Sequence, residues 1–305
     1  MLRRLIQFVL MAAIVGGAVF WVVTIPQTIP ASALPPYTPN LDNGRYMFAA
    51  GGCASCHAVP RQDDRTLLGG GRRLRSPFGN FYSPNISPDP KDGIGAWSEA
   101  DFVTAMVKGT SPDGRHYFPA FPYTSYQRMN DTDLRDLFAY LKTLKPVQGR
   151  VRDHDLPFPF NVRRLVGGWK FLFLDGKRFT ADALKSVEWN RGAYLVNGPG
   201  HCAECHSPRN LLGVIIETQR FGGGTDFDDD GWVPNISAAR LAKWTEKDIA
   251  YLLLTGMTPE GDAVGSTMDF VIRNTSQLSD ADRAAMAVYL KSLPVVAEPP
   301  RPTKK

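Results

Sequence analysis

The four cysteines of this chain fall into two pairs of identical spacing, and each pair runs directly into a histidine, in CASCH (53–57) and CAECH (202–206). On a helical turn, two cysteines at this spacing share one face and the histidine follows beside the second. The two thiols can add to the vinyl groups of one haem while the imidazole reaches its iron. The sequence therefore predicts two covalently bound haem c groups. The predicted attachment and ligand residues are Cys53, Cys56, His57, Cys202, Cys205 and His206.

A zinc site and a redox-active dithiol are the competing interpretations of these pairs. A structural zinc site needs four ligands, usually from pairs within a few tens of residues of each other. Here the pairs are 149 residues apart, as the positions of Cys53 and Cys202 show. A redox dithiol leaves the histidine in both copies without a role. Haem attachment is therefore the favoured chemistry.

The length and composition describe a globular protein with more than one core. A chain of 305 residues exceeds the usual size of a single core. Hydrophobic content of 43% and charged content of 21% are ordinary for a folded protein. The net charge of +5 is scattered, and its only basic cluster, Arg72, Arg73 and Arg75, is short. Without a basic stripe or a nucleic-acid-binding motif, we expect no nucleic-acid partner.

The N-terminal segment is predicted to anchor the protein in a membrane. Arg3 and Arg4 precede 21 uncharged residues, which are enough to cross a bilayer. The two arginines would stay in the cytoplasm and direct the rest of the chain outward. A cleaved signal peptide is the alternative, since residues 31–33 (ASA) resemble a cleavage site, but secretory apolar cores are typically about 7–15 residues long. We predict a single-pass anchor in the inner membrane, with the haem-binding part in the periplasm.

The sequence around the two cysteine motifs repeats at nearly the same interval as the motifs. PNIS occurs at 84–87 and again at 234–237, and WSEADF at 97–102 matches WTEKDI at 244–249. Tyr140 and Tyr289, near the end of each copy, are 149 residues apart. Such self-similarity predicts a duplicated domain of roughly 100 residues.

Each copy is predicted to be helical. Apolar residues recur at helix spacing from Asn130 to Pro146, and a similar pattern runs from Ser279 to Pro294. A second helix per copy is expected at 99–108 and 246–254, closed by Gly109 and Gly256, and a third around each cysteine pair. Strand-type alternation is scarce. The 28 glycines and 24 prolines predict long irregular loops between the helices, so the fold class is all-α.

The chain divides into six predicted segments. These are a transmembrane anchor (1–26), a tether (27–40), a first domain (41–148), an inter-domain segment (149–187), a second domain (188–295) and a disordered tail (296–305). The inter-domain segment contains LPFPFNVRRLVGGWKFLFLDG, which is aromatic and basic. Because so many apolar groups would otherwise lie in water, we expect it to pack across both domains.

Several segments resemble those of membrane-anchored cytochrome c subunits of bacterial periplasmic alcohol and aldehyde dehydrogenases. They are GRYMFAAGGCASCHAVP, FPAFPYTSY, FPFNVRRLVGGWKFLF, NRGAYLVNGPGHCAECHSPRN and the closing helix, and the resemblance covers about residues 41–295. Those subunits typically carry three class I cytochrome c domains, whereas this chain has two haem motifs. The resemblance implies two tandem class I domains. It also implies an electron-transfer subunit of an oxidoreductase complex, not an enzyme by itself. Electrons would come from a periplasmic or membrane-bound dehydrogenase and pass to quinone, another cytochrome or a terminal oxidase.

The resemblance further implies a methionine as the second iron ligand, from the loop ahead of each closing helix. In the second copy Met268, in GSTMDFVIRNTSQL, meets this expectation, with Met257 as the fallback. Methionine opposite histidine raises the reduction potential and closes the coordination sphere, which suits electron transfer.

The first copy departs from this pattern. Related subunits commonly have P-A-M-P-Y where this chain has Phe121, whose side chain cannot bind iron. Met129 is the predicted ligand, although Leu278 at the same position of the second copy indicates that an apolar residue ahead of a helix cap would serve equally. His116, or an iron with no second protein ligand, remains an alternative. The alternative function is a haem enzyme acting on peroxide or a sulfur anion at this first haem.

Two further motifs leave alternatives open. Asn85 and Asn235, in the repeated PNIS, could orient a haem propionate or simply hold a turn. The run Asp226, Asp228, Asp229 and Asp230 could bind calcium or form a solvated turn, although its spacing fits no familiar calcium loop.

Overall fold

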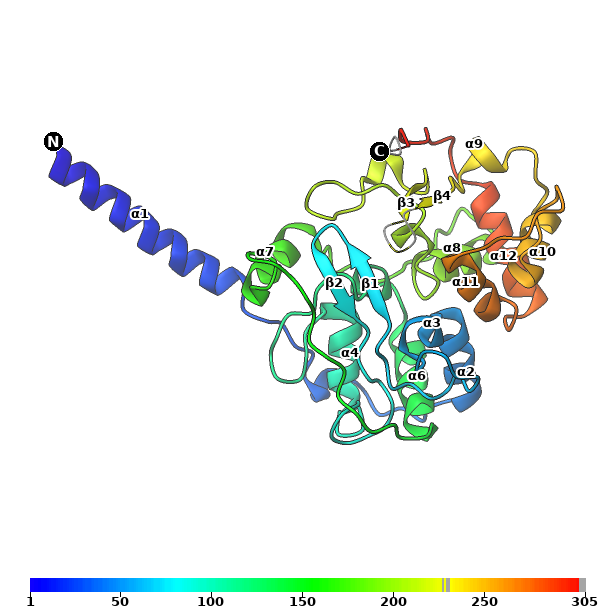
Figure 1. The fold of residues 1–305 in the computed structure, drawn as a ribbon, viewed down its shortest axis with the longest axis horizontal. Coiled ribbons are helices and arrows are strands. Elements are labelled where there is room, and N and C mark those ends of the chain that lie inside the picture. Colours follow the sequence, from blue (N-terminus) through cyan, green and yellow to red (C-terminus); the bar gives the residue numbers. More distant parts are fainter. Residues whose placement is uncertain (227, 229–230, 302–305) are drawn as a thin grey trace.

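The computed structural model describes residues 1–226, 228 and 231–301. Helix α1 (Leu2–Val23) projects away from the rest of the chain and buries none of its residues (Figure 1). Within the described residues it is the one helix long and apolar enough to cross a membrane. A 3-10 turn, η1 (Ala31–Ala33), lies in the segment that leads from α1 to the body.

The first half of the body, residues 41–148, is built around two helices that cross near the first cysteine motif. Its elements are α2 (Leu41–Ala50), α3 (Cys53–His57), β1 (Arg73–Ser76), β2 (Gly79–Tyr82), α4 (Glu99–Lys108), α5 (Tyr123–Tyr126) and α6 (Asp131–Thr143). Its buried core joins apolar side chains of α2, α3, α4 and α6 and includes Met47, Leu68, Val103 and Leu137.

The second half, residues 188–295, repeats this plan. Its elements are α8 (Val187–Asn197), η2 (Cys202–Glu204), η3 (Glu217–Gln219), β3 (Gly224–Asp226), β4 (Gly231–Val233), α9 (Ala238–Leu241), α10 (Glu246–Thr255), α11 (Thr267–Thr275) and α12 (Asp280–Lys291). Its buried core includes Leu195, Leu253 and Met286, and it also takes in Ala49 and Ala50 from the end of α2. The two cores therefore meet at the helix that precedes the first cysteine motif.

Close helix crossings explain a glycine that both halves share. A Cβ atom placed on Gly44 of α2 would lie 2.1 Å from the carbonyl oxygen of Asp136 in α6. A Cβ atom on Gly192 of α8 would lie 1.9 Å from the carbonyl oxygen of Ala285 in α12. Such distances are far inside van der Waals contact, so only glycine lets these helices cross.

The predicted helices 99–108 and 246–254 are confirmed as α4 and α10, the latter ending one residue later. Each begins with a capping box, Ser98 with Asp101 and Thr245 with Asp248, which satisfies free N–H groups of the first turn. Both end at a glycine in the left-handed conformation. The closing helices α6 and α12 likewise follow Asn130 and Ser279, as predicted.

The all-α prediction is wrong in one respect, because the chain also forms two small antiparallel sheets. In one, β1 pairs with β2, with Arg73 opposite Tyr82; in the other, β3 pairs with β4, with Gly224 opposite Val233. Strands of three or four residues are too short to show the alternation that marks a strand in a sequence. The second cysteine motif also differs from expectation, since its cysteines begin a 3-10 turn, η2, and not an α-helix.

The connecting segment, residues 149–187, packs against both halves, as its composition led us to expect. Its helix α7 (Arg163–Phe173) lies beside the base of α1 (Figure 1). Toward the first half, Asp155 forms a β-bridge with Asn80 of β2. Toward the second half, the Trp169 indole donates a hydrogen bond to the Leu212 carbonyl over 2.9 Å, and the Phe179 ring lies 5.5 Å from that of Tyr194.

Candidate haem-binding sites

The two motif histidines have the same hydrogen bond. His57 Nδ1 lies 2.8 Å from the Pro84 carbonyl oxygen, and His206 Nδ1 lies 2.7 Å from the Pro234 carbonyl oxygen. A carbonyl oxygen can only accept, so Nδ1 carries the hydrogen and Nε2 keeps its lone pair. No hydrogen bond engages either Nε2 atom within the described structure. This is how a protein orients an imidazole that binds a metal through Nε2.

The surroundings of both imidazoles favour the neutral form that a metal requires. Burial lowers the pKa of His57 and of His206, although the hydrogen bond to the proline carbonyl acts in the opposite direction. Because the neutral ring is the ligand form, no proton has to be displaced before the iron binds.

The repeated PNIS turns hold these proline carbonyls in place. Asn85 Oδ1 accepts from the Ser87 N–H over 2.9 Å, and Asn85 Nδ2 donates to the Val147 carbonyl over 2.6 Å. Asn235 is 1% exposed and makes the matching bonds to the Ser237 N–H and the Val296 carbonyl. Of the two alternatives for these asparagines, the structure therefore has them holding the turn. The orienting role of Pro84 and Pro234 was not predicted from the sequence, although PNIS recurs in both copies.

The thiols of the two motifs fit addition to a haem better than thiolate chemistry. All four cysteines are free of disulfide bonds. Burial raises the pKa of Cys53 and of Cys202 to about 12, and that of Cys56 also rises. A redox dithiol or a zinc site needs the opposite shift. Nor do the described residues include a cluster of three or more histidine, cysteine or acidic side chains that could hold a metal ion.

The two predicted methionines lie in different surroundings. Met268, in the first turn of α11, is half-buried and packs against the second core, as does Cys202. Met129 is only 1% exposed and belongs to the first core, which also contains Ala54 of CASCH. Its counterpart Leu278 is 5% exposed. The structure thus gives Met129 and Leu278 the same buried place ahead of a closing helix.

His116 is engaged away from the cysteine motifs. Its ring is 4% exposed, and Nε2 donates to the Thr24 carbonyl over 2.9 Å, at the end of α1. Gly167 of α7 closes over the same ring. Phe121, at the position of the missing methionine, packs against the rings of Tyr117 and Tyr126, both 5.7 Å away.

A buried hydroxyl near this aromatic group lacks a protein partner. Tyr123 is fully buried, and its hydroxyl has no hydrogen bond among the described residues. Tyr126, three residues later, donates from its hydroxyl to the Gly51 carbonyl over 3.3 Å, two residues before Cys53. An unpartnered donor is costly inside a protein, and a carboxylate of a bound group would satisfy it. Together with the histidines and thiols, the donor set fits haem c.

Each attachment segment is held by the opposite half. Asn274 of α11 donates to Ser55 Oγ in CASCH over 2.7 Å. Ser125 of α5 donates to Glu204 Oε1 in CAECH over 2.6 Å, and Arg209 pairs with the same carboxylate at 2.5 Å. Ser55 and Glu204 occupy equivalent positions, as do Ser125 and Asn274, so the two bonds are related by the sequence repeat.

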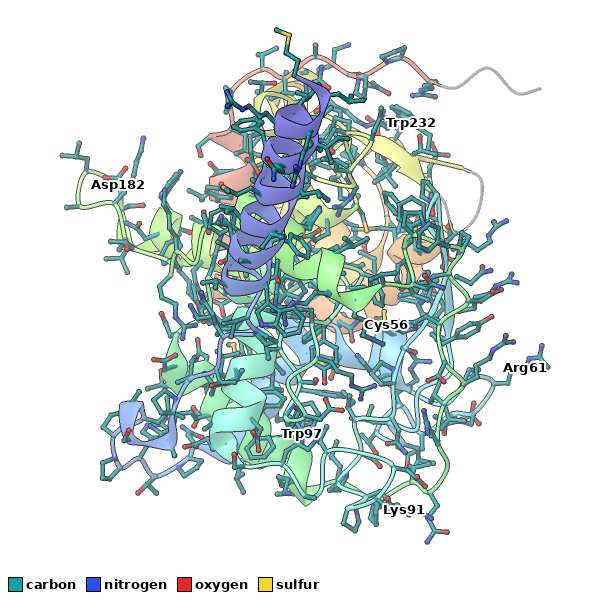
Figure 2. The ribbon with its side chains drawn as sticks, turned by 90° about the vertical axis from the view of Figure 1, so that its left-hand side faces the viewer. Cys56, Arg61, Lys91, Trp97, Asp182 and Trp232 are labelled. Atoms are coloured by element: carbon teal, nitrogen blue, oxygen red, sulfur yellow. The ribbon has the colours of Figure 1, made fainter. Side chains whose placement is uncertain are left out.

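Cys56 of the first motif lies at the junction of the two halves. Arg72, which donates to the Ser55 carbonyl beside Cys56, pairs with Asp228 of the second half. Figure 2 shows Cys56 inside the molecule, between the first half below and the second half above.

The aspartates of TDFDDDGW take positively charged and hydroxyl partners where they are described. Asp228 pairs with Arg72 at 3.0 Å, and the Arg72 guanidinium also donates to the Ser55 carbonyl over 2.9 Å. Asp226 accepts from Thr267. These contacts favour a structural turn over a calcium site. Asp229 and Asp230, the other two residues of the calcium hypothesis, lie outside the described residues.

Comparison with known proteins decides the family. A model of the cytochrome c family matches residues 41–145. A dihaem c-type cytochrome from Cereibacter sphaeroides is 45% identical over 298 residues, which is 97% of this chain and 100% of that protein. The chain belongs to the cytochrome c family. The cytochrome carries two covalently bound haem c groups and transfers electrons, and the peroxide or sulfur-anion enzyme is not favoured.

Other relatives of the cytochrome are longer subunits of dehydrogenases. The fructose dehydrogenase cytochrome subunit of Gluconobacter japonicus is 38% identical over 88% of this chain and 55% of that protein. The cytochrome c subunit of the quinone-dependent alcohol dehydrogenase of Gluconobacter oxydans is 35% identical over 85% of this chain and 55% of its own length. The cytochrome thus spans about half the length of these subunits.

Proposed function

We propose that residues 41–148 and 188–295 are two tandem class I cytochrome c domains, each holding one haem. Cys53 and Cys56 would attach the first haem and Cys202 and Cys205 the second, with His57 and His206 as axial ligands. The observation that carries this proposal is the paired geometry of the histidines, each donating from Nδ1 to the proline carbonyl of its own PNIS turn. When bound, haem supplies an iron that cycles between the ferric and ferrous states.

The contacts between the halves support this division into two domains. Tyr46 of the first half donates to Asp282 over 2.6 Å, and Tyr194 of the second half donates to Asp133. Each tyrosine hydroxyl also accepts from the N–H that precedes the facing helix, at Ser279 and Asn130 respectively. In a two-fold interface, each contact between the copies occurs twice, the second time with the equivalent residues exchanged between the copies. The halves would therefore face each other as two copies of one domain.

For the second axial ligands we propose Met268 at the second haem and Met129 at the first. The near-infrared spectrum of the oxidised protein tests both, because a methionine sulfur on ferric haem gives a charge-transfer band. In the unchanged protein, the amplitude of this absorption reports the number of sulfur-ligated irons. Met268→Ala and Met129→Leu should each remove the contribution of one iron. Leucine is the matched replacement at Met129, since Leu278 fills the equivalent place. A full band in Met129→Leu would show that Met129 only packs, and Met268 alone would stay a ligand.

Haem attachment itself is tested by mass. After expression in a host with c-type maturation enzymes, the intact chain should exceed the polypeptide mass by two haems and keep its colour through acid-acetone extraction. Cys53→Ala with Cys56→Ala should lose one haem and leave the second domain coloured. A colourless unchanged chain would contradict the assignment of both motifs.

The cytochrome is further proposed to serve a dehydrogenase. Its relatives named above are cytochrome subunits of fructose and alcohol dehydrogenases. It would take electrons from a periplasmic or membrane-bound dehydrogenase and pass them to quinone, another cytochrome or a terminal oxidase. Helix α1 would remain as the inner-membrane anchor and place both domains in the periplasm, as its length and apolar composition support.

The donor can be identified from haem reduction in membranes. Membranes from cells with and without the gene would be mixed with fructose, a primary alcohol, gluconate or nicotinate, which follow the names of the relatives. The expected result is rapid haem reduction with one substrate class, visible as the ferrous absorption bands, and none in the deletion strain. Equal reduction in both strains would contradict a role for this cytochrome in that pathway.

A further inference from the structure

Helix α7 turns apolar side chains toward the outside of the protein and a lysine toward the inside, the opposite of an ordinary surface helix. Val166, Gly167 and Lys170 face the protein and are buried. Leu165, Phe171 and Leu172 face outward and are 45%, 64% and 67% exposed. A soluble helix normally turns its apolar stripe to the core and its charges to water.

Polar contacts on the inner face fix this orientation. Lys170 Nζ donates to the carbonyl oxygens of Lys108 and Gly109, over 2.7 and 2.9 Å, and so binds the free carbonyl groups at the end of α4. Arg163 donates to the His116 carbonyl over 3.0 Å. Rolling the apolar residues inward would turn Lys170 outward, break these bonds and leave the carbonyl groups at the end of α4 without their partner. The outward apolar face is therefore built into the packing of α7.

The exposed apolar face extends beyond α7 onto neighbouring loops. The Trp169 indole is bonded to the carbonyl of Leu212, whose side chain is 56% exposed. Gly213, the next residue, lies against Phe78, whose ring is 5.0 Å from that of Phe160. We call the resulting surface the α7 patch. Its members are Phe158, Phe160, Leu165, Phe171, Leu172 and Leu212. Contiguous apolar surface of this kind marks a contact with a partner or a membrane.

The α7 patch adjoins the point where α1 leaves the body. A Cβ atom on Gly168 of α7 would lie 3.3 Å from the Phe20 ring of α1. Arg164 donates to the Trp21 carbonyl over 2.5 Å, and its guanidinium lies 4.2 Å from the centre of the Trp21 ring. Both views show α7 against the inner end of α1 (Figures 1 and 2). When α1 spans a bilayer, the membrane surface lies at this end of the helix, so the patch is level with it.

We propose that the α7 patch docks on the outer leaflet of the phospholipid bilayer, with its aromatic and leucine side chains at the boundary of headgroups and acyl chains. This inference rests on the proposed function, in which α1 is retained as an anchor. Lipid is the occupant that α1 itself brings to this surface, because the apolar helix ends beside α7. The second contact fixes the tilt of the body, so that the first domain faces the membrane.

Spin labelling of the full-length holoprotein in phosphatidylcholine–phosphatidylglycerol vesicles tests the proposal. The native cysteines are taken up by haem, so a single introduced cysteine can carry a nitroxide. The labelled variants are Leu172→Cys in the α7 patch, Ile14→Cys in α1 and Tyr251→Cys on α10, at the opposite end of the molecule (Figure 1). All three side chains are exposed, by 67%, 72% and 56%, so the fold and the haem spectrum should be unchanged. The readout is the ratio of accessibility to oxygen, which enters lipid, over a water-soluble nickel chelate.

The expected result is a ratio several-fold higher at Leu172→Cys than at Tyr251→Cys, approaching that at Ile14→Cys. A ratio at Leu172→Cys equal to that at Tyr251→Cys, with Ile14→Cys in lipid, would overturn the docking alone. Spin–spin broadening at Leu172→Cys that disappears on dilution with unlabelled protein would overturn it in favour of a second copy. A water-exposed label at Ile14→Cys would overturn the proposed anchor, and the docking with it.

Discussion

Removal of one buried tyrosine hydroxyl should weaken the association of the two halves measurably. Tyr194 is 4% exposed and donates to Asp133, a carboxylate that is itself 9% exposed. Without that hydroxyl, the Asp133 side chain keeps, among the described residues, only the hydrogen bond from the Asn43 amide, at 2.8 Å. A hydrogen bond to a charged group contributes about 1.5–3 kcal/mol to stability. Tyr194→Phe should therefore lower the free energy of unfolding by about 1.5–3 kcal/mol.

The equivalent substitution in the first half, Tyr46→Phe, should lower the free energy of unfolding by less. Tyr46 is half-buried, and its partner Asp282 keeps both hydrogen bonds from Arg191, at 2.9 and 2.7 Å. We expect a loss of about 0.5–1.5 kcal/mol, the range of an ordinary hydrogen bond. The order of the two variants thus follows from what remains on each carboxylate.

Chemical unfolding of the holoprotein, followed by circular dichroism at the haem absorption bands, measures both losses. Tyr117→Phe is the matched control, because the described structure gives its hydroxyl no hydrogen bond. That variant should stay within about 0.5 kcal/mol of the unchanged protein. If Tyr46→Phe proves as costly as Tyr194→Phe, or neither differs from the control, the account of the interface is wrong.

Three further predictions concern charge and packing. Burial opposes ionisation of Asp282, but the bonds from Arg191 and Tyr46 outweigh it and lower its pKa, so its contribution to stability is present above about pH 4 and lost as pH falls through the lowered pKa. Asp282→Asn should flatten this part of the unfolding free energy measured against pH, and an unchanged slope would contradict the assignment. Gly192→Ala should destabilise by about 3 kcal/mol or more, since its Cβ would meet a carbonyl oxygen at 1.9 Å, whereas Gly265→Ala, with open space around it, should stay near neutral in the same unfolding assay. Glu204→Gln removes a buried negative charge beside Cys205 and should raise the reduction potential of at least one haem, and a redox titration that gives unchanged potentials would refute this.

The elements that the sequence predicted well are those defined by local signals. Helices α4 and α10 begin at capping boxes and end at glycines in the left-handed conformation, all within about ten residues. The cysteine motifs are equally local, because one turn of chain contains both thiols and the imidazole. Where the interactions that form an element lie within a few residues, a single sequence is enough to find it.

The remaining features depend on contacts between distant residues. The partners that Ser55 and Glu204 find in the opposite half lie more than 75 residues away in the chain, so no periodicity marks them. His116 could be assigned no place from sequence because its partner Thr24 lies 92 residues earlier, at the end of α1. The 3-10 turn at the second motif and the short hairpins are set by their tertiary surroundings, which override local preference. Iron binding by Met129 stays a prediction, since a buried methionine at this position is expected both for packing and for ligation.

The exchanged bonds at the two attachment segments have a consequence for the direction of electron flow. In a dimer of identical single-haem ancestors, both sides would carry the same pair of side chains and the two irons would have equal potentials. Fusion of the copies into one polypeptide allowed the pair to diverge, into Ser55 with Asn274 on one side and Glu204 with Ser125 on the other. One attachment segment therefore carries a carboxylate and the other a neutral hydroxyl. We therefore expect the two haems to have unequal reduction potentials, so that electron transfer between them favours one direction.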